Sequence, residues 1–283
     1  MSQISRDRTE TLHQDSTSQP LEIIEEATFD SFDLAEPVKV LEKIPANFQE
    51  CLDSTKWKDR KDALDELNSH LRVPKIEDGS YGSLVQQLSK RLADANILVV
   101  ISAAQCLENL SRGLRKSFSP YRSEVIPALL ERFKEKKQNV IEAVRSTLDT
   151  MGKYSLPTMF EMQDLLTPFL AHKNPQVKSE TLLWLSRSQN KPGNKKDIKS
   201  FLSAVLPTID DSSPEVRESS INLLASMISV SGQANVMPFL DTLDKTKQAK
   251  LIELTKAQSS QAQSIPIASN LGKQRSAPPA TPA

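Results

Sequence analysis

The sequence contains few of the residues on which glycine loops, disulfides and metal sites depend. Its 283 residues include only seven glycines, two cysteines and three histidines, and aromatic residues make up 5%. This scarcity disfavours a glycine-looped nucleotide enzyme and an aromatic-rich β-barrel. The two cysteines, Cys51 and Cys106, cannot build a disulfide framework or a four-thiolate zinc site. Because the histidines also lack metal-ligand spacing, we expect no metal and no other cofactor.

Long apolar runs and enzyme motifs are also missing. The longest pure apolar run, Ile97–Ile101, is far shorter than the ~20 residues that span a bilayer, and the N-terminus has no apolar signal core. No nucleophile–base motif, phosphate-binding glycine loop or HExxH motif occurs. We therefore expect a cytoplasmic protein that is reduced, does not bind a membrane and is not an enzyme.

Charge is balanced over the whole chain but unevenly distributed. Lys+Arg and Asp+Glu number 36 each, which disfavours nucleic acid as a partner. Residues 1–36 contain nine acidic and two basic residues, a net charge of −7, whereas the body between the two tails has a net charge of +5. With few large apolar residues, 1–36 is predicted to be an acidic disordered arm. Residues 259–283, rich in Pro, Ser and Ala, are predicted to be a disordered tail, which leaves 37–258 as the folded domain.

The folded domain is predicted to be helical and repetitive. Apolar residues recur at helical spacing, as at Leu84, Leu88 and Leu92. Similar turn sequences begin at residues 54, 94, 135, 172 and 211, with steps of 40, 41, 37 and 39. A period of about 40 residues with two helices per unit is typical of HEAT and armadillo repeats. We predict an all-α solenoid of six HEAT repeats, because stacked helix pairs bury a face that one pair leaves exposed.

Stacking places every intra-repeat turn along one long edge, and this edge is the predicted binding site. The candidate residues on it are Trp57, Lys58, Asn96, Lys136, Lys137, Lys173, Lys178 and Arg217. Most are cations that recur at related positions of successive turns. A solvated charge run is the ordinary interpretation of such lysines, but their recurrence favours docking of an acidic protein partner.

Two of these residues have alternative interpretations. Trp57, which is flanked by lysines, has the setting of an exposed interface residue, although a lone tryptophan is as often part of the core. Arg217 either contacts a partner or braces its turn through Asp210 or Asp211. Arg60, with acidic residues on either side, is expected to brace its turn in that way.

The same stretches carry a family resemblance. Ile44–Phe48 followed by Ser54–Leu64 resembles the start of a TOG domain, of the second-domain type in the ch-TOG/Minispindles family of microtubule polymerases. The resemblance covers roughly residues 40–258; its further colinear stretches are Asp94–Asn96, Gly113–Lys116, Phe133–Val140, Lys173–Pro175 and Asp211–Arg217. Phe29–Leu34 also resembles the linker that precedes this domain in the family.

The resemblance implies a flat paddle whose intra-repeat turns bind one αβ-tubulin heterodimer. It implies that Trp57 contacts β-tubulin, that Arg217 contacts α-tubulin, and that Asn96, Lys137 and Lys178 contribute from the turns between them. Family members bind unpolymerised tubulin and deliver it to growing microtubule plus ends. The implied location is the microtubule cytoskeleton, including the spindle, the spindle pole body or centrosome, and the kinetochore.

The sequence departs from the family in having only one TOG domain and no dimer-length heptad run. A polymerase needs a second tethered site at high effective concentration, so a longer parent chain with further TOG domains is expected. Two other functions stay open: a generic HEAT-repeat scaffold or adaptor, and a TOG-like microtubule rescue or pause factor. The acidic arm is expected either to act as a tether or to fold back on the basic edge.

Overall fold

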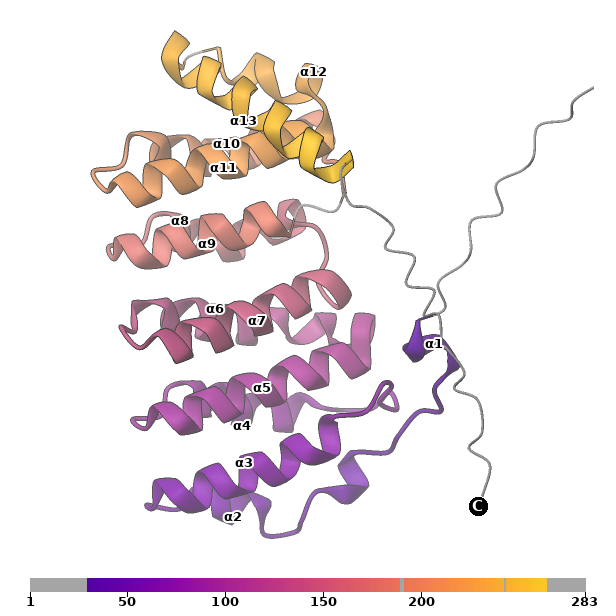
Figure 1. Cartoon of the computed structure of the whole chain (residues 1–283). Helices are drawn as coiled ribbons and strands as arrows, with labels where there is room; N and C mark the ends of the chain where they lie inside the picture. The colour runs from indigo at the N-terminus through magenta and orange to yellow at the C-terminus, as the bar shows by residue number, and fades with distance from the viewer. Residues whose placement is uncertain (1–29, 189–190, 242, 264–283) are drawn as a thin grey trace, which may run out of the picture.

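In the computed structural model, which describes residues 30–188, 191–241 and 243–263, helix pairs stack one upon another (Figure 1). The six pairs are α2 (Phe48–Leu52) with α3 (Trp57–Leu71), α4 (Gly82–Leu92) with α5 (Ile97–Leu114), α6 (Arg122–Leu130) with α7 (Gln138–Tyr154), α8 (Gln163–Leu170) with α9 (Pro175–Arg187), α10 (Lys195–Val205) with α11 (Pro214–Ser231), and α12 (Gln233–Val236) with α13 (Lys245–Gln263). The second helix of each pair packs on the second helix of the next. The predicted all-α solenoid of six HEAT repeats is therefore confirmed, and the described residues contain no β-structure beyond one isolated bridge.

The first helix of each pair is short and is often extended by a 3-10 turn. These turns are η2 (Arg115–Tyr121), η3 (Glu131–Lys134), η4 (Met159–Met162), η5 (Leu206–Asp210) and η6 (Met237–Phe239), and η1 (Leu41–Lys43) precedes α2. Prolines lie within several of these segments, as Pro127 does in α6 and Pro168 in α8. Because proline removes a backbone donor, these first helices are less regular than the second helices that line the other face.

The core is a continuous row of apolar side chains between the two helical layers. Every second helix of the first five pairs contributes at least one completely buried leucine: Leu64, Leu107, Leu148, Leu185 and Leu224. Each such side chain stabilises the fold by about 1.5–3 kcal/mol relative to an exposed one. Trp184 is also completely buried, and its indole N–H donates to the carbonyl oxygen of Leu148 at 3.0 Å, so this tryptophan is part of the core.

One stretch, 97–134, meets the length and composition of a membrane-crossing helix. Of its apolar window, 61% is buried inside the protein, and the stretch is divided into α5, η2, α6 and η3. Its apolar character is explained by its position in the second and third repeats, where α5 packs against both α3 and α7.

The N-terminal boundary differs from the prediction. Residues 30–36 fall within the predicted disordered arm, yet Ser31–Leu34 forms the short helix α1 on the edge where successive pairs are joined (right in Figure 1). The segment is ordered because Asp30 forms an ion pair with Arg115 and because Phe32 packs against the same guanidinium. The remainder of the predicted arm, residues 1–29, lies outside the described residues.

The C-terminal boundary differs as well. Helix α13 continues to Gln263, past the predicted end of the domain at residue 258. Ala and Gln, which make up three of the five added residues 259–263, have high helix propensity, and the first helix-breaking proline of the tail is Pro266. The predicted tail residues 264–283 lie outside the described residues.

Candidate functional site: an edge of recurring turns

The five predicted turns share one backbone conformation and lie along one edge of the stack (left in Figure 1). In each turn the second helix begins at the fourth residue of the repeated frame: α3, α5, α7, α9 and α11 begin at residues 57, 97, 138, 175 and 214. The residue before each helix has φ between −81° and −96° and ψ between 116° and 126°. We call the frame segments 54–60, 94–100, 135–141, 172–178 and 211–217 the turn edge.

The capping residues explain why the chain turns here. The side-chain oxygen of Asn96 accepts from the N–H of Leu98 at 2.9 Å, and that of Asn174 accepts from the N–H of Gln176 at 2.9 Å. These bonds satisfy amide groups that have no partner within the helix. Pro175 and Pro214 occupy the first helical position, where a missing N–H costs nothing. Asn96, a predicted contact residue, therefore also caps α5.

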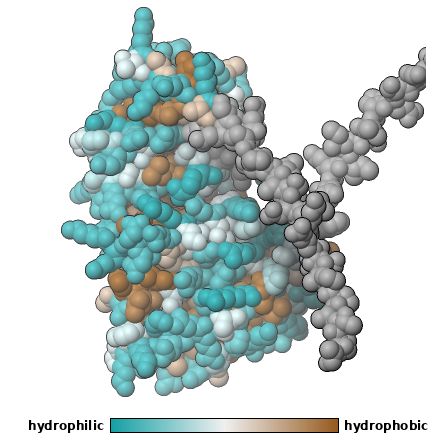
Figure 2. Space-filling view, in the orientation of Figure 1, coloured by the Kyte–Doolittle hydropathy of each residue, from teal (hydrophilic) through white to brown (hydrophobic). Residues whose placement is uncertain are grey.

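Trp57 is the first residue of α3 and is 43% exposed, which excludes the alternative that it belongs to the core. Leu98, on the next turn, is 39% exposed. The described part of the chain has four exposed large hydrophobic residues, and these two both lie on the turn edge. Figure 2 shows an apolar patch on this otherwise largely polar edge. Two neighbouring turns thus present apolar side chains to solvent, as a protein-binding surface does.

Leu98 was not among the predicted site residues. The apolar run Ile97–Ile101 is consistent with a buried helix start, and Val99 and Val100 are indeed buried. A helix buries only part of its circumference, so one member of such a run must face away from the core. That excess of apolar residues was the only indication in the sequence that Leu98 would be exposed.

The predicted cations fall into two groups. Lys58, Lys136, Lys137 and Lys173 are exposed, and none of them has an ion-pair partner within the described residues. Lys178 is only 15% exposed and forms an ion pair with Asp211 of the next turn. The ammonium group of Lys178 holds the pKa of the Asp211 carboxyl below its usual value. Lys178 therefore links two turns, unlike the free cation that the sequence suggested.

Arg217 braces its own turn. Its Nη1 donates to the carbonyl oxygens of Asp211 and Ser212, at 2.7 and 3.0 Å. Arg60, at the same frame position four turns earlier, donates from Nη1 to the carbonyl oxygens of Ser54 and Thr55, at 2.8 and 3.2 Å. The bracing that the sequence suggested is thus present, but it uses backbone carbonyl oxygens rather than the carboxylates of Asp210 or Asp211.

Adjacent turns are also tied to each other. The Arg60 guanidinium binds the Asp94 carboxylate through Nε–Oδ2 and Nη2–Oδ1 bonds, both 2.8 Å, and the Asp94 side chain is 4% exposed. Burial raises the pKa of Asp94, but Arg60 and the backbone N–H of Asn96 outweigh burial and hold that pKa below its usual value. Lys178 and Asp211 repeat this link between the fourth and fifth turns, so ion pairs fix the spacing of the turns at both ends of the row.

The turn edge combines exposed apolar and cationic side chains with ion pairs that join its turns. Besides Trp57, Leu98 and the exposed lysines, the acidic side chains of Asp59 and Glu215 are also exposed on it. No group of three or more His, Cys, Asp or Glu side chains that could hold a metal ion occurs in the described ranges. An apolar patch beside unpaired lysines is suited to a protein partner with an acidic surface.

The sequence of the chain matches known proteins. A family model described as XMAP215/Dis1/CLASP, TOG domain, matches residues 42–256. The chain is 40% identical to protein mini spindles of Drosophila melanogaster over 230 residues, and 38% identical to the spindle pole body component alp14 of Schizosaccharomyces pombe over 230 residues. These matches cover 79% and 80% of this chain but only 11% and 28% of the relatives.

Two solved structures show the same architecture. One, from work on microtubule plus-end tracking by XMAP215, CLIP-170 and EB1, has a TM-score of 0.75 and 38% identity, and the match covers 80% of this chain and 95% of that one. The other, from work on tubulin recruitment and assembly by microtubule polymerases with TOG domain arrays, has a TM-score of 0.69 and 29% identity, with coverage of 81% and 49%.

Proposed function

Because the chain belongs to the XMAP215/Dis1/CLASP TOG domain family, we propose that its turn edge binds one αβ-tubulin heterodimer. The observation that carries this proposal is the exposure of Trp57 at the first position of α3. A tryptophan that a partner covers is a frequent source of binding energy, with truncation costing about 2 kcal/mol or more. The relatives and solved structures named above include spindle proteins and microtubule polymerases, and this similarity supports tubulin as the partner.

Different residues of the turn edge contribute to binding in different ways. Trp57 and Leu98 lose apolar surface to the partner at one end of the row. Lys136, Lys137 and Lys173 attract an acidic surface and orient it during approach, which raises the association rate more than the final affinity. Arg217 binds at the other end, where its backbone contacts hold the guanidinium in place so that less side-chain entropy is lost on docking.

We further propose that this domain acts within a longer microtubule plus-end polymerase of the spindle and cytoskeleton. One domain accounts for holding one tubulin dimer. Repeated delivery to a growing end needs further tubulin-binding domains at high effective concentration. The chain spans 11% and 28% of the two relatives named above, which leaves room in such proteins for more domains of this size.

Size-exclusion chromatography with unpolymerised tubulin tests the proposal. The full chain should co-elute with tubulin, and the Trp57→Ala/Lys173→Ala variant should not. The matched control is Leu41→Ala/Lys191→Ala, which also removes one exposed apolar and one exposed basic side chain but at positions outside the turn edge. Melting curves should be alike for all three proteins. Binding by the Trp57→Ala/Lys173→Ala variant at parental strength would refute the turn edge as the site.

A further inference from the structure

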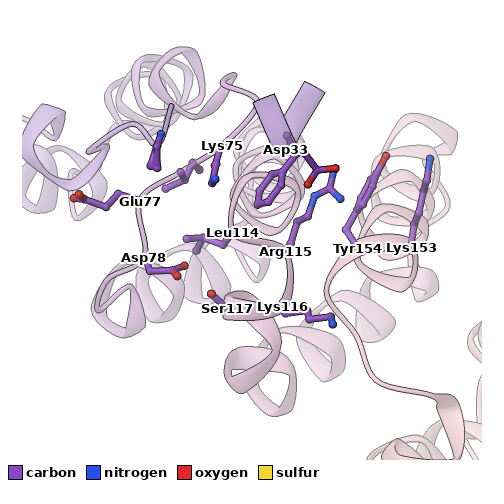
Figure 3. Close-up of a pocket in the computed structure, with 13 residues that line it drawn as sticks. Asp33, Lys75, Glu77, Asp78, Leu114, Arg115, Lys116, Ser117, Lys153 and Tyr154 are labelled. Atoms are coloured by element: carbon purple, nitrogen blue, oxygen red, sulfur yellow. The ribbon is translucent and has the colours of Figure 1, made fainter. Parts of the chain in front are cut away.

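A second candidate site lies on the edge opposite the turn edge, where α5 and α7 end. Arg115 is its central residue, and a cavity of about 820 Å³ surrounds it. Phe32 and Asp33 of the lead-in, which we define as residues 30–34, line one side of this cavity, and Tyr154 at the end of α7 also lines it. We call this cavity the Arg115 pocket (Figure 3).

Asp30 uses its two carboxylate oxygens for different purposes. One oxygen accepts from the backbone N–H of Phe32 at 3.1 Å and so caps α1. The other binds the guanidinium of Arg115 in an ion pair. The same carboxylate therefore shapes the peptide and attaches it to the domain. Because Asp30 and Phe32 both contact Arg115 and lie two residues apart, the site is suited to peptides with Asp-x-Phe spacing.

Phe32 completes the recognition. The guanidinium of Arg115 lies 4.1 Å from the centroid of the Phe32 ring and 4.8 Å from that of the Tyr154 ring, so one cation contacts two aromatic faces. Lys75 adds a second cation 5.2 Å from the Phe32 ring. In Figure 3 the Arg115 side chain lies beside the ring of Tyr154, on the side of the pocket that faces the lead-in.

The backbone at this site is unusual. Arg115 has φ +48° and is the only non-glycine residue with positive φ in the described ranges. A positive φ costs energy in an arginine, and such strain concentrates where a side chain must be aimed at a ligand.

Next to the lead-in, Val38 pairs with the loop before α4. The N–H of Val38 donates to the carbonyl oxygen of Lys75 at 3.1 Å, and the carbonyl oxygen of Val38 accepts from the N–H of Glu77 at 2.9 Å.

We propose that the Arg115 pocket is a docking site for acidic–aromatic peptides with Asp-x-Phe spacing, which Asp30–Phe32 occupies in cis and a partner with the same spacing occupies in trans. The recognition elements are three side chains of the repeats, Arg115, Tyr154 and Lys75, and they contact the lead-in through side-chain chemistry that another peptide can supply. The lead-in makes few other contacts; Leu34, for example, is 73% exposed.

The charges of the pocket favour an acidic peptide and set its direction. Lys116 and Lys153 line the pocket on the Arg115 side, and neither has an ion-pair partner among the residues described. Glu77 and Asp78 lie on the other side (Figure 3). Acidic residues of a bound peptide should therefore lie toward Arg115.

The pocket and the turn edge lie on opposite edges of the stack (Figure 1), so a peptide bound in the pocket leaves the turn edge free.

Fluorescence anisotropy with a labelled peptide of residues 27–36 tests the proposal in the full chain. In the parent protein the lead-in already engages the Arg115 guanidinium. In the Asp30→Ala/Phe32→Ala variant, which we call the emptied variant, Arg115 has lost these contacts, and the peptide should bind at least tenfold more tightly than to the parent. The matched control, Ser31→Ala/Leu34→Ala, alters two exposed positions of the lead-in that do not line the pocket and should behave like the parent. A peptide with Asp30 and Phe32 exchanged should not bind any of the proteins.

A third variant assigns the binding to Arg115. Adding Arg115→Lys to Asp30→Ala/Phe32→Ala keeps the positive charge but removes the planar group that contacts both rings, and peptide binding should be lost. If that variant melts early, Tyr154→Leu in the same background replaces it. Equal binding to the parent and to the emptied variant, no binding to the emptied variant, or binding of the exchanged peptide would each overturn the proposal. Tubulin is absent from these assays, so they succeed or fail independently of the turn edge.

Discussion

Arg60 of the first turn and Asp94 of the second are joined by two parallel N–H···O bonds of 2.8 Å each. The Nη1 of the same arginine also holds the carbonyl oxygens of its own turn. One guanidinium thus fixes both the shape of the first turn and its distance from the second. Trp57 and Leu98 lie on these two turns, so the spacing of the apolar contacts depends on this ion pair.

Replacing Asp94 by Asn should destabilise the domain by about 3 kcal/mol, because Arg60 would stay buried without its counter-charge. Urea unfolding at pH 7 measures the change. Asp53→Asn is the control: Asp53 also faces basic groups, Lys90 and Arg91, but it is 48% exposed, and exposed pairs contribute only about 0–1 kcal/mol. Equal losses for the two variants would contradict the structural role of Asp94.

The contribution of Asp94 should depend on pH in one direction. Its pKa is lower in the folded protein than the ordinary value of about 3.9 in an unfolded chain. The stabilisation is therefore complete above that ordinary value and is lost as the pH falls through the lower, folded value. The difference in unfolding free energy between the parent and Asp94→Asn should be constant from pH 7 to about pH 5 and should shrink below about pH 4. A difference that grows on acidification would have the wrong sign.

Leu98→Ala should weaken tubulin binding by about 1.5 kcal/mol, roughly tenfold in Kd, if a partner covers this leucine. Leu41 offers a matched control, because it is also a leucine with 39% exposure but precedes the first repeat. Titration of labelled tubulin should show the loss for Leu98→Ala alone, with unchanged melting curves. Equal effects of the two substitutions would mean that the second turn is not part of the interface.

Substitutions of the turn-edge lysines should have two different effects, one on tubulin association and one on stability. Substitution of Lys136, Lys137 and Lys173 by Gln should slow association with tubulin and flatten its dependence on salt, with little effect on folding. Lys178→Gln should instead lower the unfolding free energy, because it leaves Asp211 without its partner. Stopped-flow association over a salt series, together with urea unfolding, separates the two effects. A Lys178→Gln variant of parental stability would contradict the assignment.

The sequence predicted the repeats because the turn sequences that mark them are local patterns. Asn174 and Pro175 define a helix start by capping and by a fixed φ. Pro214 repeats the fixed φ one repeat later, although Ser213 before it makes no side-chain cap bond. Such short-range rules hold whatever surrounds them. The sequence left two interpretations of Trp57 open, because a tryptophan beside lysines is compatible with either the buried or the exposed side of a helix.

Long-range partners could not be predicted in the same way. Lys178 and Asp211 are separated by 33 residues, and their pairing depends on how two repeats stack. The contact between Asp30 and Arg115 spans 85 residues and overrides a composition that by itself indicates disorder. Composition describes what a segment can bury on its own, whereas the lead-in is ordered by side chains at the ends of other helices, above all Arg115 at the end of α5.

The common backbone of the five turns has a consequence for how such proteins change over time. Five corners with nearly identical dihedral angles accept tryptophan, isoleucine, glutamine or proline at the same position, the first residue of the helix that follows. A substitution at this position changes the side chain that a binding partner meets and leaves the backbone of the turn in place. Evolution and protein design can therefore change this first position one turn at a time, whereas the exchange of whole turns would break the Arg60–Asp94 and Lys178–Asp211 ion pairs.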